Sequence, residues 1–216
     1  MKNHHQYIPA LRFHFLTPLY DAALKYIMRE QRFKEELCKI IPTQAEKILD
    51  AGCGTGTLTA MMKRTHSLSE VHGIDIDDTV LTIARKKFER NSQHIILHQG
   101  TILQLPFENN SFDAVFSCLV LHHLNTQQKQ EAIKEIFRVL KPGGIFAVAD
   151  FSTPHTIPMM VITLITQYLE ETYDNFHGRL LEFIPNAGFI HPDVHSNFWT
   201  PMGTVSIITA IKPTIS

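Results

Sequence analysis

Between residues 47 and 151, short apolar runs alternate with longer amphipathic segments. In the amphipathic segments, apolar residues recur at intervals of three and four, which is the period of a helix. Strands that alternate with helices pair in parallel, and the helices cover both faces of the sheet. The pattern predicts strands at 47–50, 70–75, 94–99, 113–119 and 143–150 and helices at 57–64, 79–90 and 126–140.

The segments that flank this region follow other patterns. Residues 19–41 place apolar side chains among charges at helical spacing, which predicts one amphipathic helix or two short ones that end at Pro42. Toward the C-terminus the chain predicts a helix near 157–172 and two strands, 188–199 and 204–213. Because a short connection joins these strands, we expect them to be antiparallel. The predicted fold is α/β, with a Rossmann-like, doubly wound, mostly parallel sheet and an antiparallel C-terminal strand pair at one edge.

Charge and composition argue against several classes of partner. The 216 residues carry a formal net charge of −1 and no long basic run, so non-specific attraction to nucleic acid or anionic lipid is not expected. No apolar run reaches the roughly 20 residues that a membrane span needs. Cys38, Cys53 and Cys118 follow no disulfide or metal-ligand spacing, which favours a reducing compartment. We therefore expect a cytoplasmic protein without a metal site, whose partner is a small molecule.

A turn rich in glycine joins the first predicted strand to the helix that follows, within the sequence ILDAGCGTGTL. Gly52, Gly54 and Gly56 have no side chains, so the backbone can turn sharply and a ligand can approach it closely. In open parallel sheets, such turns lie beyond the carboxyl ends of the strands, where ligands bind. Asp75 ends the next strand, nineteen positions after Gly56, where a carboxylate can accept hydrogen bonds from ribose hydroxyls.

Plainer roles exist for both features. The turn could be a tight strand-to-helix connection that binds nothing. Asp75 alone could be a helix cap, although Asp77 or Asp78 is better placed to cap the helix that follows.

The details of the turn select among nucleoside ligands. A dinucleotide-binding turn would read G-x-G-x-x-G, but position 57 is Thr57, and the Gly-Lys-Ser/Thr sequence of a phosphate-binding loop is absent. Asp50, just before the turn, would repel a pyrophosphate and attract an ammonium group. S-adenosylmethionine has a ribose for Asp75 and an ammonium group for Asp50, and it carries no phosphate. The pattern therefore favours S-adenosylmethionine as the cofactor, with S-adenosylhomocysteine as its product.

Four segments, of which the glycine turn is the first, occur in order along residues 46–151: LDAGCGTG, VHGIDIDDTVLTIARKK, LPFENNSFDAVFSCLVLHHL and LKPGGIFAVAD. Together they resemble the class I S-adenosylmethionine-dependent methyltransferases, and within them the small-molecule branch that includes the ubiquinone and menaquinone biosynthesis enzymes. The resemblance implies that the glycines line the methionine part of the cofactor, Asp75 the ribose and Ile76 the adenine. Ser117 and Cys118 would face the cofactor where methyl transfer occurs. The expected cofactor contacts are Asp50, Gly52, Cys53, Gly54, Gly56, Asp75, Ile76, Thr101, Ile102, Ser117, Cys118 and Tyr20.

One position departs from the pattern of the family. Many members carry an acid after the glycine of the third strand region, where it accepts a hydrogen bond from the adenine amino group, but this chain has Thr101. A hydroxyl can still accept, and the backbone N–H of Ile102 can serve the ring. A neutral hydrogen bond is roughly half as strong as a charge-assisted one, so we expect modest cofactor affinity.

The methyl acceptor and its base are less clearly marked. His122 and His123 follow the fourth strand, and the ordinary histidine pKa suits a base near neutral pH. The alternative is that one imidazole is buried and serves the structure. The chain lacks the Asn/Asp-Pro-Pro-Tyr/Phe run of amino-methylating DNA enzymes, so nucleic acid is not an expected substrate.

These observations favour a methyltransferase that acts on an O, N or C atom of a small, apolar or aromatic molecule. Two alternatives are a non-catalytic S-adenosylmethionine-binding sensor or assembly protein, and a nucleotide-dependent oxidoreductase, which the glycine spacing disfavours. We expect one domain over 1–216, and the sequence leaves a homodimer open. Its parts would be a helical cap or lid (1–42), the cofactor-binding core (43–151) and a substrate-side helix with terminal strands (152–216).

Overall fold

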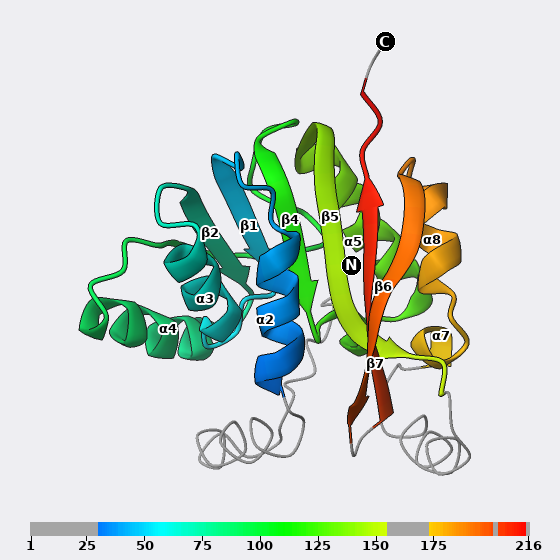
Figure 1. Cartoon of the computed structure of the whole chain (residues 1–216), viewed down its shortest axis with the longest axis horizontal. Coiled ribbons are helices and arrows are strands. Elements are labelled where there is room, and N and C mark those ends of the chain that lie inside the picture. The colour runs from blue at the N-terminus through cyan, green and yellow to red at the C-terminus, as the bar shows by residue number, and fades with distance from the viewer. Residues whose placement is uncertain (1–29, 155–172, 201–202, 215–216) are drawn as a thin grey trace, which may run out of the picture.

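The computed structural model describes residues 30–154, 173–200 and 203–214 of the chain. In this part a seven-stranded sheet has the order β3-β2-β1-β4-β5-β7-β6, with helices on both of its faces (Figure 1). The elements are α2 (Glu30–Ile40), β1 (Lys47–Ala51), α3 (Thr57–Thr65), β2 (Glu70–Asp75), α4 (Asp78–Arg90), β3 (Ile96–Gln99), β4 (Phe112–Cys118), the 3₁₀ turn η2 (Leu121–His123), α5 (Thr126–Val139), β5 (Leu140–Ser152), α7 (Tyr173–Phe176), α8 (Leu180–Asn186), β6 (Ile190–Thr200) and β7 (Gly203–Ile211).

The predicted sheet is confirmed. Strands β3, β2, β1, β4 and β5 pair in parallel, whereas β7 is antiparallel to β5 and β6 is antiparallel to β7. The last strand of the chain therefore lies between β5 and β6, and β6 forms the edge. Within the described residues, no helix is long and apolar enough to cross a membrane.

Several predicted boundaries need correction. Strand β5 begins at Leu140 rather than at Gly143, because Leu140 already pairs with Phe112 before an irregularity in the register. Helices α7 and α8 were not predicted, since segments this short do not show a helical period in the sequence. The helix expected near 157–172 and the first part of the helix expected at 19–41 lie outside the described residues.

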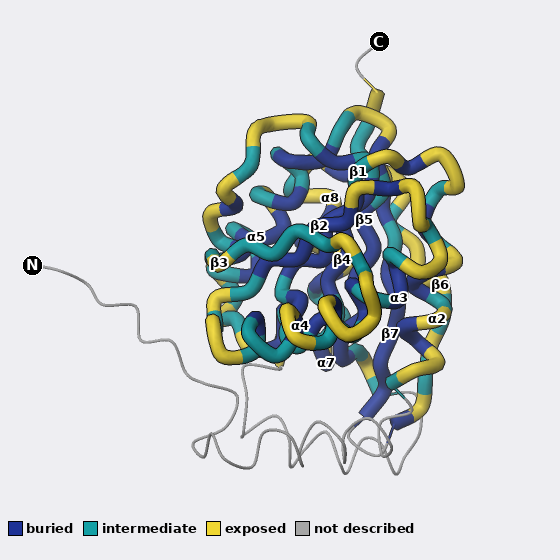
Figure 2. Tube along the Cα trace, turned by 90° about the vertical axis from the view of Figure 1, so that its left-hand side faces the viewer, coloured by how far each residue is buried: buried dark blue, intermediate teal, exposed yellow. Residues whose placement is uncertain are grey.

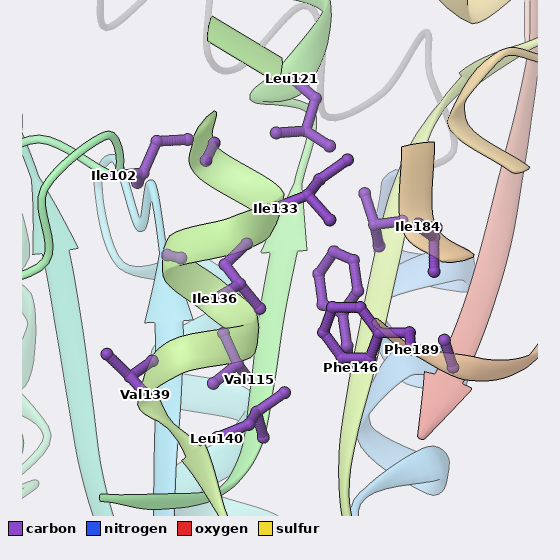
Figure 3. Close-up of a cluster of buried hydrophobic side chains, with 14 of the residues drawn as sticks. Ile102, Val115, Leu121, Ile133, Ile136, Val139, Leu140, Phe146, Ile184 and Phe189 are labelled. Atoms are coloured by element: carbon purple, nitrogen blue, oxygen red, sulfur yellow. The ribbon is translucent and has the colours of Figure 1, made fainter. Parts of the chain in front are cut away.

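Each face of the sheet has its own hydrophobic cluster. Neighbouring residues of a strand point to opposite faces, so Ile48 belongs to the cluster under α2 and α3, while Leu49 belongs to the cluster under α5 and α8. Figure 3 shows the second cluster, in which Ile133 and Ile136 of α5 meet Phe146 of β5. Strands that are buried on both faces have continuous apolar sequences. Figure 2 shows buried stretches of the chain, in dark blue, in the interior of the molecule.

The turn between β1 and α3 uses a backbone that favours glycine. Gly52, Gly54 and Gly56 have φ angles of 82°, 51° and 71°, in the left-handed region. A Cβ atom at Gly56 would lie only 2.4 Å from Cζ of Phe88 on α4, whereas a Cβ at Gly54 would meet nothing within 4 Å. Gly56 is therefore required by packing, and the backbone at Gly54 lies beside open space.

We expect Gly56→Ala to destabilise the fold more than Gly54→Ala does. Both substitutions incur the cost of a left-handed alanine, about 1–2 kcal/mol, and only Gly56→Ala adds overpacking of about 1–3 kcal/mol against Phe88. Free energies of unfolding from urea titrations of both variants test this difference. Equal losses would mean that Phe88 moves aside without cost.

Candidate active site

The carboxyl ends of the parallel strands lie side by side along one border of the sheet (Figure 1). This border, across the strand ends, is the edge meant below and is distinct from the edge strand β6. Three of these strands carry an aspartate at or near that end: Asp50 of β1, Asp75 of β2 and Asp150 of β5. The glycine turn follows β1, α4 begins shortly after β2, and η2 follows β4. In open α/β sheets this edge is the usual position of a ligand site.

Hydrogen bonds fasten the glycine turn to the end of β2. The backbone N–H of Gly52 and that of Cys53 donate to the carbonyl of Ile74 at 2.8 and 2.9 Å. The N–H of Gly54 donates to the Asp75 carboxylate, with 2.8 Å between Gly54 N and Oδ2. The position of Asp75 therefore fixes the shape of the turn.

Asp75 keeps capacity for a ligand. Its second oxygen, Oδ1, accepts from the N–H of Asp77 at 3.0 Å, so two of the roughly four acceptor sites of the carboxylate are used. Burial raises the pKa of Asp75, against the hydrogen bonds from the backbone. The cap of α4 is Asp77, whose side chain accepts from the N–H of Thr79 at 2.8 Å. The plainer role of helix cap thus belongs to Asp77.

The surroundings of Asp75 suit a nucleoside. Ile76, the next residue, has 45% of its surface exposed and offers an apolar face beside the carboxylate. Thr101 lies after β3, where Gly100 N donates to the carbonyl of Asp75 at 2.9 Å. The Thr101 hydroxyl accepts from the N–H of Leu103 at 3.2 Å. Ile102 buries its side chain in the core.

Asp50 is enclosed beneath the turn. Its exposed fraction is 1%, and it accepts a hydrogen bond of 2.6 Å from the Thr59 hydroxyl. Burial raises its pKa to about 6, against the hydrogen bond from Thr59 and the attraction of Lys34. The contact predicted between Asp50 and a ligand ammonium group stays a prediction.

Lys34 is a charged residue of this region that the sequence analysis missed. It lies on α2 with 9% of its surface exposed and forms an ion pair with Glu30. Burial alone would lower its pKa, but the acidic groups around it, which include Asp50, raise it. Its place between Phe33 and Leu37, on the apolar stripe of an amphipathic helix, is the signal that could have identified it.

Ser117 and Cys118 lie where β4 ends. The Ser117 side chain is fully buried, and its hydroxyl donates to the carbonyl of Ala51 at 3.0 Å, which ties β4 to β1. Cys118 is half-buried and Cys53 is buried, and burial raises the pKa of both thiols. Their predicted contacts with the cofactor stay predictions.

His122 and Asp150 form a buried pair. The His122 ring nitrogen Nδ1 lies 2.8 Å from Oδ1 of Asp150, and 5% of the His122 surface is exposed. Backbone N–H groups of Leu121 and Phe151 also donate to the carboxylate, each at 2.8 Å. Burial alone would raise the pKa of Asp150, but the attraction and hydrogen bonds of His122 lower it overall.

Two consequences follow for the predicted bases. Because Asp150 stays ionised and can only accept, Nδ1 of His122 carries a proton. Desolvation, followed by the adjacent imidazole of His122, lowers the pKa of His123 to about 4, although part of its side chain is exposed. Asp150 was missed as a site residue, and its signal was an aspartate in an otherwise apolar strand.

The structure brings most of the predicted site residues to one edge of the sheet. Tyr20 lies outside the described residues. Among the residues that are described, no group of three or more His, Cys, Asp or Glu side chains could hold a metal ion. The open space at Gly54, the half-used Asp75 carboxylate and the exposed Ile76 fit the amino-acid part, ribose and adenine of S-adenosylmethionine.

Comparisons with known proteins agree with this geometry. Residues 49–148 match the family model of a methyltransferase domain. A demethylmenaquinone methyltransferase of Staphylococcus aureus (strain JH9) is 32% identical over 173 residues, which cover 69% of this chain and 70% of that protein. An O-methyltransferase of Pyrenophora dematioidea is 32% identical over 123 residues, or 56% of this chain. The chain spans only 45% of that protein and 46% of another Staphylococcus aureus demethylmenaquinone methyltransferase.

The fold also has a close counterpart among solved structures. A SAM-dependent methyltransferase from Thermotoga maritima superposes with a TM-score of 0.70 at 19% identity, over 92% of this chain and 97% of that one. An identity this low supports the fold alone, whereas the match to the Staphylococcus aureus protein shows common membership of a family. The chain therefore belongs to the class I S-adenosylmethionine-dependent methyltransferases, the family that includes the demethylmenaquinone methyltransferases.

Proposed function

We propose that this protein transfers a methyl group from S-adenosylmethionine to an O, N or C atom of a small, apolar or aromatic molecule. The observation that carries the proposal is the glycine turn held by Asp75, with open space at Gly54. When bound, S-adenosylmethionine would supply an electrophilic methyl group on a sulfonium. The protein then has to hold the cofactor, align the acceptor and take up its proton.

The described residues proposed to hold the cofactor lie around this turn, and Tyr20 is outside the described part of the chain. The N–H of Gly54 orients the Asp75 carboxylate, and the remaining lone pairs of that carboxylate would accept from the ribose hydroxyls. Ile76 would lie against the adenine, and Thr101 with the backbone of Ile102 would meet its edge. The others are Asp50, Gly52, Cys53, Gly56, Ser117, Cys118 and Tyr20.

His122 is the base that the geometry favours. Asp150 accepts a hydrogen bond from Nδ1 of the imidazole. A proton released by the methyl-accepting substrate would therefore pass to Nε2. His123 is a weaker candidate, because a pKa of about 4 makes it a poor proton acceptor at neutral pH. Both assignments are supported by their position after β4, at the same edge as the glycine turn.

The relatives bear on the choice of acceptor. Those from Staphylococcus aureus are named for demethylmenaquinone, an aromatic quinone, which supports an aromatic acceptor for this chain too. The net charge of −1 supports the absence of nucleic acid as a substrate. We infer a cytoplasmic location from the charge and the three unpaired cysteines. A homodimer stays a prediction.

The first test is binding followed by turnover. We expect S-adenosylhomocysteine at 100 times its Kd to raise the Tm by about 5–10 °C, because it stabilises only the folded state. Methyl transfer from labelled S-adenosylmethionine is then measured on demethylmenaquinol, a phenol and an aromatic amine. Unchanged melting curves would refute cofactor binding, and binding without transfer to any acceptor would favour the non-catalytic alternative.

Asp75→Ala should weaken S-adenosylhomocysteine binding by about 1–3 kcal/mol, since it removes an acceptor from the ribose hydroxyls and leaves Gly54 N–H without its partner. Asp78→Ala is the matched control, because that carboxylate is exposed and its ion pair among the described residues is with Arg85. Titration calorimetry on both variants measures the difference. Equal affinities in the two variants would show that Asp75 does not contact the cofactor.

Thr101→Asp should tighten S-adenosylhomocysteine binding, and Thr101→Val should weaken it. A carboxylate at this position can accept from the adenine amino group more strongly than a hydroxyl does, and valine cannot accept at all. The gain expected from the aspartate is about 1 kcal/mol in the free energy of binding. If neither substitution alters the Kd, the side chain of residue 101 points away from the adenine.

A further inference from the structure

Asn175 on α7 carries a buried carboxamide without a partner. Its exposed fraction is 1%, and within the described part of the chain neither Oδ1 nor Nδ2 has a hydrogen-bond partner. Among the described residues, the other buried side chains with an unpaired polar atom are Gln93 and Ser196, and the Gln93 amide nitrogen still donates to Ala60 at 2.8 Å. Buried polar groups are almost always hydrogen-bonded, so an amide with both atoms unpaired calls for a specific explanation.

The backbone around Asn175 is held in place on both sides. Its neighbour Asp174 accepts from the Thr126 hydroxyl at 2.6 Å and from the Arg179 guanidinium at 2.5 Å. Its other neighbour, Phe176, lies against Phe151 of β5, with 6.0 Å between the ring centroids. Because both neighbours are anchored, the backbone at Asn175 is held in place.

Two aromatic contacts connect the helix of Asn175 to the pair formed by His122 and Asp150. The Phe151 ring, which contacts Phe176 on one side, lies 4.9 Å from the ring of His122 on the other. Figure 1 shows α7 near the end of β5, at the edge of the sheet where the parallel strands end. A methyl acceptor whose proton passes to His122 would therefore lie within the same aromatic surroundings.

We propose that Asn175 recognises the methyl acceptor, and that the acceptor carries a hydroxyl group on an aromatic or apolar body. A carboxamide offers one acceptor and two donor positions, and a hydroxyl can both donate to Oδ1 and accept from Nδ2. Phe151 and Phe176 supply the apolar surroundings for the body of the molecule. The inference rests on the proposed function and narrows its range of acceptors.

A recognition role and a structural role have opposite effects on stability. A polar group kept unpaired for a ligand costs stability in the free protein, so its replacement by an apolar group of similar size stabilises the fold. An amide that is bonded to a buried water belongs to the structure, and its replacement destabilises the fold. Asn175→Leu therefore distinguishes the two roles before any acceptor is added.

We expect Asn175→Leu to raise the Tm by about 2–4 °C and to leave the Kd for S-adenosylhomocysteine unchanged. Asn125→Leu is the control, because that side chain accepts from Gln128 N at 3.0 Å as the cap of α5, and its loss should lower the Tm. Asn175→Ala accompanies the test, since it cannot overpack. If both Asn175 variants are less stable than the wild type, the amide is structural and the proposal is overturned.

The second measurement tests recognition of the methyl acceptor directly, by comparing the binding of two ligands. Naphthalene-1,4-diol and naphthalene are titrated into protein saturated with S-adenosylhomocysteine, under reducing conditions. The wild type should prefer the diol about tenfold, and Asn175→Leu and Asn175→Ala should lose that preference. A wild type without preference, or variants that keep it, would overturn the recognition role. Failure of the proposed function would appear separately, as absence of S-adenosylhomocysteine binding.

Discussion

Parallel pairing of β1 with β2 on one side and β4 on the other is the constraint on which the rest of the molecule depends. Because parallel strands all end at the same edge, the connections that follow them must open there together. The glycine turn, Asp75 and the pair of His122 and Asp150 become neighbours for this reason alone. The connections that lead into the parallel strands lie at the opposite ends of these strands. The two hydrophobic clusters, one on each face of the sheet, hold the strands in place.

Three aspartates at this edge show how surroundings assign different roles to one residue type. Asp50 is buried against the Thr59 hydroxyl, and its pKa rises to about 6. Asp75 is half-buried and holds the turn through backbone N–H groups, with lone pairs to spare. Asp150 is buried against an imidazole, and its pKa falls. Burial disfavours each charge, and the partner of each carboxylate decides how far that effect is offset.

Several buried charged side chains lie near the carboxyl ends of the strands, where they contribute little to the stability of the fold. Lys34, Asp150 and Asp174 are all buried near the carboxyl ends of the strands, and each depends on a specific partner. Buried ion pairs are weak contributors to folding, because the desolvation of two charges offsets their attraction. Their accumulation at one edge of the sheet is therefore better explained by a binding site than by the stability of the fold.

The sequence by itself determined the elements between residues 47 and 151, the glycine turn, the family, and that Asp77 or Asp78 rather than Asp75 would cap the following helix. Each of these depends on periodicity or spacing over a few residues, which local backbone geometry dictates. Only the tertiary structure decided that β7 lies between β5 and β6 and that Asp150 pairs with His122, 28 positions away. It also decided that Lys34 and Asn175 are buried. Contacts between residues that are distant in the chain depend on which strands pair and on which side chains become buried. Neither can be predicted from a pattern that covers only a few residues.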